Sequence, residues 1–309
     1  MIECEGLTHA YGPAEPALAG VNLQIAKGEC FGLIGANGAG KTTTIRILST
    51  LLVPSGGRAR IDGRDVVTDY LTVRRMIGYM PEAPAVFPEF RVVEFLDYTA
   101  ALHGLNRAER DRRVQSVLAI TDLSSKRDTL CASLSLGMRQ RLFLARALVH
   151  DPKVLILDEP SSGLDPAARV EFRHIMRELT ASGATIVVSS HILPELSSFC
   201  TSVGILERGK LVVSGSVDDV LATVKGSAEI AIDVQGDVSF AAQQLRSKPG
   251  VSAIRVEANR ISIEFTGGRE QQAALLRALV DAGVVVVSFA ERRATLEEIF
   301  MKVAAFETA

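Results

Sequence analysis

The chain has 309 residues, of which 47% are hydrophobic and 23% are charged, and these values predict a globular protein with one large or two smaller domains. Its formal net charge of -2 lacks the basic excess expected of a protein that binds nucleic acid, so we expect no nucleic-acid partner. No run approaches the roughly 18 uncharged apolar residues that cross a bilayer, and the first residues lack the pattern of a signal peptide. We therefore expect that the chain itself does not span a membrane.

Cysteine usage predicts the compartment. The four cysteines are scattered, with no CxxC pair and no spacing typical of metal ligands; they are Cys4, Cys30, Cys131 and Cys200. This is the pattern of a protein in a reducing cytosol, where such side chains act as small buried apolar groups.

Short apolar runs rich in Ile, Leu and Val predict buried parallel strands that are covered on both faces. These runs cover residues 30–34, 154–157 and 184–188. Helical patterns are found over residues 92–102, 110–118, 138–149 and 167–179. Because strands and helices alternate along the chain, the first part of the sequence predicts an α/β fold.

The pattern changes near residues 221–226. From there the sequence predicts a strand, a helix, two strands, a helix, a strand and a last helix, over residues 229–234, 241–247, 253–257, 260–266, 270–282, 284–289 and 296–303. This is a ferredoxin-like order of elements, so we expect residues 221–309 to form a separate, small α+β domain.

A phosphate-binding motif, GxxxxGK[ST], lies between the predicted strand 30–34 and a helix that runs through Leu48. It reads Gly35-Ala36-Asn37-Gly38-Ala39-Gly40-Lys41-Thr42. Glycines allow positive φ and a close approach of the backbone, so that successive N–H groups and the helix N-terminus can surround a phosphate chain. Lys41 then reaches the β and γ phosphates, and the Thr42 hydroxyl can bind Mg²⁺. The alternative, a glycine-rich turn without a ligand, fits the flanking strand and helix less well.

Two adjacent carboxylates, Asp158 and Glu159, end the apolar strand 154–157. Side chains alternate along a strand, so the two point in different directions and can have different roles. Asp158 is the candidate ligand of Mg²⁺, and Glu159 is the candidate that orients and polarises an attacking water. A polar strand end without function is the alternative for this motif taken alone.

The order of these motifs resembles that of the ATP-binding subunits of ABC transporters over about residues 2–220. The resemblance implies a P-loop NTPase of the ABC type in residues 1–220, with a mixed sheet core, a helical subdomain at about 84–150, and ATP and Mg²⁺ as cofactors. Tyr11 stands where the family has the aromatic residue that stacks on adenine. Thr43 directly follows the phosphate loop and falls within the nucleotide-binding segment.

Two further stretches match this family. Ser135 and Gly137 lie in a stretch that resembles the ABC signature, which sits at a helix start and binds the γ-phosphate held by the opposite subunit. This stretch departs from LSGGQ by having Leu136 in place of a glycine and Met138 in place of the glutamine. Asp165 lies in a stretch that resembles the D-loop, which links the two active sites of the dimer.

His191 and Glu82 stand at two more positions of the family. His191 follows the predicted strand 184–188 and matches the switch histidine, which contacts the γ-phosphate and helps to hold the attacking water. Glu82 occupies the position of the Q-loop glutamine, which reaches the Mg²⁺, and the segment after it touches the membrane partner. A carboxylate suits a hard cation, although it adds negative charge beside the phosphates. An acidic loop residue without a role is the alternative for Glu82.

The C-terminal region resembles the accessory domain on the ATPases of drug, antibiotic and polysaccharide exporters, down to the ending Thr295-Leu296-Glu297-Glu298-Ile299-Phe300. A regulatory or dimer-stabilising role follows from this resemblance as a hypothesis. An amphipathic terminal helix that docks on its own sheet would show the same ending.

The family resemblance implies that two copies, or this chain and a paired ATPase subunit, close around two ATP molecules. Closure would drive transport, with export as the expected direction, through a separate integral membrane permease. The chain would then be cytoplasmic and bound to the inner face of the cell membrane through that permease. The main alternative is a soluble ABC-type ATPase that acts on ribosomes or DNA, but such proteins usually carry two nucleotide domains or a long coiled coil, and the sequence shows neither. A non-catalytic member is disfavoured because Glu159 is present.

Overall fold

The computed structural model describes residues 1–12, 15–83, 85, 87–191, 193–223 and 228–292 of the chain. The chain forms two compact units, Met1–Val217 and Asp218–Ala309. The sequence predicts the boundary after residue 220, and helix α8 (Val217–Thr223) spans both positions. Within the described ranges, no helix is both long enough and apolar enough to cross a bilayer.

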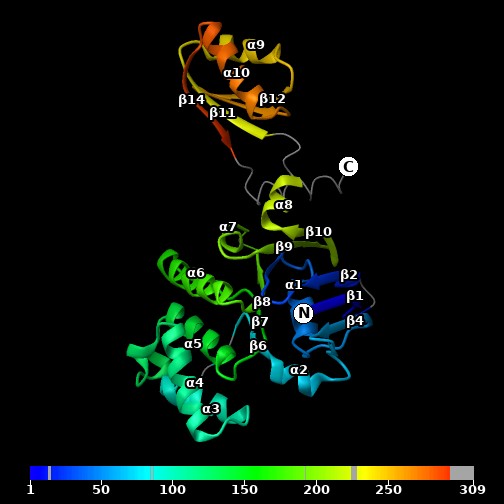
Figure 1. Ribbon diagram of the computed structural model, residues 1–309, viewed down its shortest axis with the longest axis vertical. Helices are drawn as coiled ribbons and strands as arrows, with labels where there is room; N and C mark the ends of the chain where they lie inside the picture. Colours follow the sequence, from blue (N-terminus) through cyan, green and yellow to red (C-terminus); the bar gives the residue numbers. More distant parts are fainter. Residues whose placement is uncertain (13–14, 84, 86, 192, 224–227, 293–309) are drawn as a thin grey trace. The chain divides into compact units, whose positions relative to one another are not determined.

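A six-stranded sheet with the order β10-β9-β3-β8-β7-β6 lies at the centre of the first unit (Figure 1). Its strands are β3 (Cys30–Ile34), β6 (Ile77–Met80), β7 (Val154–Leu157), β8 (Thr185–Ser190), β9 (Ser202–Glu207) and β10 (Lys210–Ser216). Strands β3, β6, β7, β8 and β9 run parallel to one another, and β10 is antiparallel to β9. Every residue of β3, β7 and β8 is buried, so the prediction of three parallel strands covered on both faces is confirmed.

A second, antiparallel sheet forms the other side of this unit, and the sequence patterns do not predict it. Its order is β2-β1-β4-β5, with β1 (Ile2–His9), β2 (Leu18–Ile25), β4 (Gly56–Ile61) and β5 (Arg64–Asp65). Helix α1 (Lys41–Leu48) lies between the two sheets, and its buried residues Ile45, Ile47 and Leu48 pack in one core with apolar side chains of both (Figure 1). The helix that follows the phosphate loop is therefore held on two sides.

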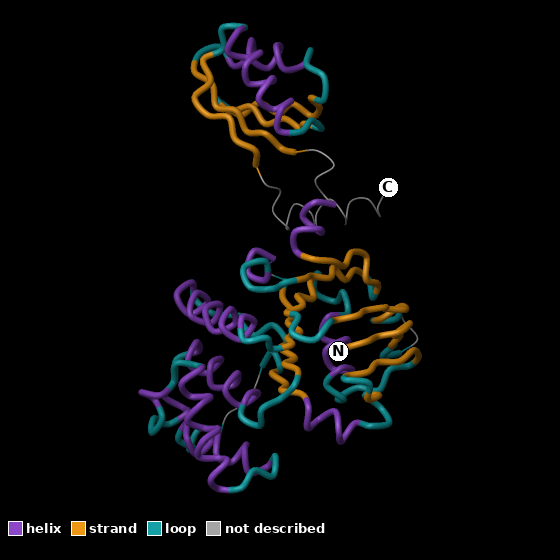
Figure 2. Tube along the Cα trace, in the orientation of Figure 1, coloured by secondary structure: helices purple, strands orange, loops and turns teal. Residues whose placement is uncertain are grey.

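The third part of this unit is a group of helices, shown in purple in the lower part of Figure 2. It contains α3 (Val92–Leu102), α4 (Arg107–Ile120) and α5 (Leu136–Leu148), which pack against one another. The rings of Phe95 and Phe143 meet edge to face in its core, with centroids 6.2 Å apart. The other helices are α2 (Tyr70–Met76), α6 (Pro166–Ala181) and α7 (Leu193–Leu196), with 3₁₀ turns at Ser124–Lys126 and Cys131–Ser133. The prediction of a mixed sheet core with a helical subdomain is confirmed.

The second unit has the order strand, helix, strand, strand, helix, strand. Its elements are β11 (Ala228–Gln235), α9 (Val238–Arg246), β12 (Val251–Glu257), β13 (Arg260–Phe265), α10 (Arg269–Asp281) and β14 (Val285–Arg292). The strands form an antiparallel sheet in the order β12-β13-β11-β14, and the apolar residues of β11 and β13 pack on those of both helices. The predicted ferredoxin-like arrangement is confirmed. The predicted last helix, residues 296–303, and the ending 295–300 lie outside the described residues.

One glycine shows how closely the helical group packs on the central sheet. Gly78 lies in β6, and a Cβ at this position would overlap the carbonyl oxygen of Ala147 in α5 and lie 2.9 Å from Cδ2 of Leu155. The backbones of β6 and α5 can therefore approach each other only because residue 78 has no side chain.

We predict that Gly78→Ala destabilises the first unit by about 1–3 kcal/mol, because the added methyl group forces these two backbones apart. For a unit of this size the melting temperature should fall by several degrees in circular dichroism. Gly12→Ala is the matched control, since a Cβ at residue 12 would have no neighbour within 4 Å among the described residues. An unchanged melting temperature for Gly78→Ala would contradict the packing described.

Candidate functional site

The loop of residues 35–40 joins β3 to α1 and has the geometry of an anion site. Gly40 has a φ of 108°, and a Cβ there would lie 2.5 Å from the carbonyl oxygen of Ala17, so a side chain is excluded. Gly40 is also the N-cap of α1 and offers no capping side chain. Because the first N–H groups of a helix lack partners within the helix, those of α1 are available to a phosphate.

Lys41 is the first residue of α1, and only 5% of its surface is exposed. Its Nζ donates to the carbonyl oxygens of Gly35 (2.8 Å) and Ala36 (3.2 Å). The same atom lies 3.5 Å from Oε1 of Glu159. The ammonium group is thus held across the loop, where it can contact a phosphate chain that the loop N–H groups bind.

Thr42 and Asp158 come together from α1 and from the end of β7. The Thr42 hydroxyl donates to Oδ1 of Asp158 over 3.3 Å. A hydroxyl and a carboxylate are oxygen ligands that Mg²⁺ prefers, and Mg²⁺ in nucleotide sites takes its remaining ligands from phosphates and water. This pair therefore fits a cation that phosphate oxygens help to bind. The described part of the chain contains no cluster of three or more His, Cys, Asp or Glu suited to a metal.

Glu159 turns away from Asp158 because of its backbone. The N–H of Asp158 still donates to the carbonyl oxygen of Met80 in β6 (2.9 Å), so Asp158 continues the sheet ladder. Glu159 has a φ of 44°, a left-handed conformation that is uncommon for a residue with a side chain. Its Oε2 lies 2.9 Å from Nδ1 of His191. The two carboxylates diverge as expected, but the cause is this turn rather than strand alternation.

Ser189 is a site residue that the sequence patterns miss. It lies in β8, is fully buried, and its hydroxyl donates to Oδ1 of Asp158 (2.7 Å). The Ser189 hydroxyl oxygen also accepts the N–H of Glu159 (2.9 Å). One hydroxyl therefore fixes both the side chain of the first carboxylate and the backbone of the second. Its position two residues before His191 is the only signal in the sequence, and the bonding becomes visible only when β7 and β8 are adjacent.

Tyr11 follows β1 and is 63% exposed. Its hydroxyl lies 3.3 Å from Oγ1 of Thr43, the third residue of α1. The aromatic ring therefore stands beside the helix that follows the phosphate loop, with surface free for a flat ligand.

Ser135, Gly137 and Asp165 lie at the starts of two packed helices. The Ser135 hydroxyl caps α5 by accepting the N–H of Met138 (3.2 Å), and the Asp165 carboxylate caps α6 by accepting the N–H of Ala168 (2.9 Å). A Cβ on Gly137 would lie 2.8 Å from that of Ala168, so this glycine allows close packing of α5 on α6. In the described residues, none of the three bonds to the phosphate loop or to the two carboxylates.

Glu82 lies in the loop after β6 and is exposed. Among the residues described, its carboxylate forms no hydrogen bond or ion pair with Thr42 or Asp158. The site is nevertheless close to β6, because the carbonyl oxygen of Met80 in this strand accepts the N–H of Asp158. Burial and the charge of Asp158 also raise the pKa of Tyr79 in β6. The structure thus gathers the phosphate loop, the two carboxylates and His191, and leaves Glu82 outside their hydrogen bonds.

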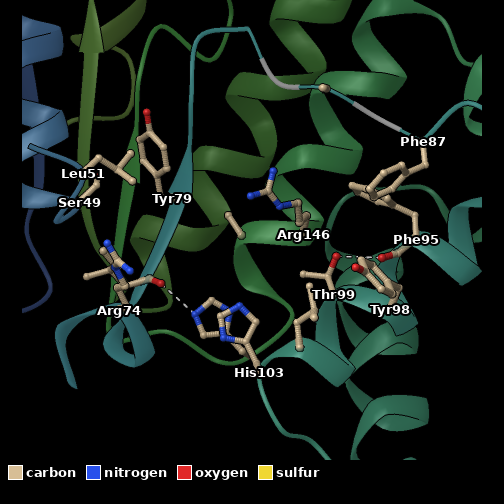
Figure 3. Close-up of a pocket in the computed structure, with 15 residues that line it drawn as sticks. Ser49, Leu51, Arg74, Tyr79, Phe87, Phe95, Tyr98, Thr99, His103 and Arg146 are labelled. Atoms are coloured by element: carbon tan, nitrogen blue, oxygen red, sulfur yellow. Dashed lines mark hydrogen bonds between the residues drawn. The ribbon is translucent and has the colours of Figure 1, made fainter. Parts of the chain in front are cut away.

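A groove of about 560 Å³ lies between β6 and α3, beside the loop that contains Glu82 (Figure 3). Its aromatic wall consists of Phe87, Phe95 and Tyr98, with ring centroids 6.4 Å apart for Phe87 and Phe95 and 6.0 Å apart for Phe87 and Tyr98. Phe87 and Tyr98 are 49% and 43% exposed, so they present apolar surface to solvent. Such surface beside a nucleotide site is typical of a contact with another protein.

Histidine and arginine side chains line the opposite side of the groove. The rings of His103 and His150 stack with centroids 3.7 Å apart, and Nε2 of His150 donates to the carbonyl oxygen of Ile77 (2.9 Å). Burial and the neighbouring His103 lower the pKa of His150 to about 4, and burial and Arg146 lower the pKa of His103. These shifts favour the neutral form of both rings. Arg74 and Arg146 also line the groove, and no acidic residue lines it in the described part of the chain.

Comparisons with known proteins agree with this geometry. The ABC transporter family matches residues 18–162, and the C-terminal domain of DrrA1-3-like ATP-binding proteins matches residues 215–304. The chain is 33% identical over 303 residues to the daunorubicin resistance ATP-binding protein DrrA3 of Streptomyces coeruleorubidus, a match that covers 97% of this chain and 94% of that protein. It is 32% identical over 305 residues to the Nod factor export ATP-binding protein I of Ralstonia nicotianae, covering 98% and 93%.

A solved structure is similar to the first unit. It is the dimeric structure of an ATP-binding cassette in a post-hydrolysis state, bound to ADP and phosphate, with a TM-score of 0.63 and 26% identity. The match covers 70% of this chain and 99% of that chain. The predicted family, fold and enzymatic activity are confirmed by these likenesses. The chain belongs to the ABC transporter family, in which it is an ATP-binding subunit that hydrolyses ATP.

Proposed function

We propose that this ATPase drives export through a separate integral membrane permease, and that it works as a dimer, with itself or with a homologous subunit. The observation that carries the proposal is the convergence of Lys41, Thr42, Asp158 and Glu159, joined by contacts of 3.3 and 3.5 Å, at the edge of one sheet. Such a site can cleave ATP, and in this proposal the energy released moves the permease, which is another chain. The names of the relatives, which concern daunorubicin resistance and Nod factor export, support export as the direction.

Each group near the phosphate loop receives a role in this proposal. The N–H groups of the loop and Lys41 bind the β and γ phosphates and stabilise the charge that develops during transfer. Thr42 and Asp158 hold Mg²⁺, which when bound neutralises phosphate charge. Glu159 accepts a proton from the attacking water, and His191, 2.9 Å away, orients that carboxylate and can donate to the γ-phosphate.

The remaining predicted residues act at the edges of the site. Tyr11 stacks on adenine, beside Thr43. Ser135, Gly137 and Asp165 act on the nucleotide of the opposite subunit. In agreement with this role, none of them bonds to the phosphate loop of the same chain among the described residues. Glu82, in the loop after β6, is proposed as a further ligand of the Mg²⁺. The second unit, residues 218–309, is an accessory domain that regulates or stabilises the dimer.

The groove between β6 and α3 is the surface on which we place the permease. Aromatic side chains form one wall and two arginines supply positive charge, so the groove suits a cytoplasmic segment that carries an apolar side chain and a carboxylate. Ala85 and Phe87 line the groove and belong to the loop that follows Glu82. Binding there would place the chain on the inner face of the membrane, and movement of this loop would link the permease to the nucleotide.

Replacement of Glu159 by Gln tests the proposed base and the dimer together. The amide cannot accept the proton, so ATP turnover should fall at least about 100-fold while ATP still binds. Because hydrolysis no longer separates the subunits, light scattering after gel filtration with Mg-ATP should show twice the monomer mass. Glu178→Gln on the exposed surface of α6 is the matched control. Hydrolysis at the parental rate would show that another group acts as the base.

Ser189→Ala should slow ATP hydrolysis about 5-fold to 100-fold, because it frees the Asp158 carboxylate and leaves the buried N–H of Glu159 without an acceptor. The Mg²⁺ concentration for half-maximal rate should rise as well. Ser189→Thr, which keeps the hydroxyl, should restore part of the rate. Ser182→Ala, which removes a hydroxyl bonded to the carbonyl oxygen of Leu179, is the control. An unaltered Mg²⁺ requirement would exclude a role for Ser189 in the metal site.

Arg146→Glu should prevent binding of the permease, because it places a negative charge against the expected carboxylate. The measurement is the amount of the integral membrane protein, identified by mass spectrometry with the parent chain, that co-purifies with the tagged variant from membranes. Arg58→Glu, on the exposed surface of β4, is the matched control. Equal recovery with both variants would place the permease elsewhere.

A further inference from the structure

The side chain of Tyr11 is exposed, yet it is held at two points. Its hydroxyl lies 3.3 Å from Oγ1 of Thr43, and its ring meets the ring of His9 edge to face, with centroids 4.7 Å apart and planes at 80°. An exposed tyrosine without such contacts samples several rotamers, and a ligand that stacks on it must select one of them. The two contacts remove this freedom in advance.

His9 is itself fixed by the fold. It is the last residue of β1, pairs with Leu18 in β2, and is only 8% exposed. Its Nδ1 lies 3.5 Å from the hydroxyl of Ser55, which also accepts the N–H of Ala10 over 3.3 Å. Both the backbone and the ring plane of His9 are therefore set by the antiparallel sheet and the segment before β4.

We propose that His9 is a positioning residue for ATP, which orients the Tyr11 ring so that adenine can stack on it. The inference rests on the proposed role of Tyr11. His9 acts through Tyr11 and is buried, so its effect is confined to the base of the nucleotide. The triphosphate is bound by the phosphate loop and Lys41, which His9 does not touch in the described residues.

Because His9 should affect binding of the base and not of the phosphates, ATP and a phosphate chain without a base can be compared. Binding of Mg-ATP and of inorganic tripolyphosphate with Mg²⁺ is measured by isothermal titration calorimetry for the parent and for His9→Ala. Loss of one aromatic pair should raise the Kd for ATP about 3-fold to 10-fold and leave the Kd for tripolyphosphate unchanged. In steady-state hydrolysis the KM for ATP should rise by the same factor while kcat stays constant. His9→Phe, which keeps a ring edge against Tyr11, should bind ATP like the parent.

A double-mutant cycle separates His9 from Tyr11. Tyr11→Ala should weaken ATP binding more than His9→Ala does. The double variant should bind ATP no more weakly than Tyr11→Ala alone, because His9 acts only through the tyrosine. His174→Ala, an exposed histidine on α6, is the control. Equal weakening of ATP and tripolyphosphate by His9→Ala, or no weakening of either, would overturn the inference. If Tyr11→Ala changes the Kd values for ATP and tripolyphosphate equally, the stacking role of Tyr11 is contradicted, and so is the role of His9 that depends on it.

Discussion

Three neighbouring parallel strands, β3, β8 and β7, end at one edge of the six-stranded sheet, and the whole site depends on this alignment. Because parallel strands point the same way, the segments that follow them emerge side by side. The phosphate loop follows β3, the two carboxylates follow β7, and Ser189 and His191 lie at the end of β8. Residues more than 100 positions apart in the chain are thereby placed within hydrogen-bond distance, as the contact between Thr42 and Asp158 shows.

The site contains charged side chains that are buried, and burial of a charge lowers stability. Lys41 and Glu159 are 5% and 7% exposed, and a buried ion pair usually loses more by desolvation than it gains by attraction. Carbonyl oxygens of the phosphate loop bond to the ammonium, and His191 contacts the carboxylate, which reduces this cost. Glu159 also carries a strained backbone with a φ of 44°, a cost of about 1–3 kcal/mol. Glu159 thus combines a buried charge with backbone strain, and both lower stability. Its proposed chemical role, and not a gain in stability, explains this arrangement.

Strand β6 links the nucleotide site to the groove over a short distance. Met80, the last residue of this strand, accepts the N–H of Asp158, and Tyr79, the residue before it, lines the groove. The chain then passes Glu82 and reaches Phe87 in the aromatic wall. A change in charge at the carboxylates and a change in the loop after β6 are therefore physically adjacent, which is what coupling between hydrolysis and a partner protein requires.

The sequence alone determined the features that depend on nearby residues. The phosphate loop, the helix start at Ser135, the helix start at Asp165 and the order of elements in the second unit were all predictable, because turn chemistry, capping and periodicity act over a few residues. The continuous apolar runs also identified β3, β7 and β8.

Only the tertiary structure decided which strands are neighbours, and this determined the rest. The sequence patterns do not predict the antiparallel sheet of β1, β2, β4 and β5, because it contains half-exposed strands joined by pairing between distant segments. The bridge made by Ser189 could not be predicted, since it exists only when β8 lies beside β7. The same holds for His9 under Tyr11 and for the groove beside β6. Pairing across long sequence separations leaves no local pattern, because its free energy comes from contacts that form only in the folded chain.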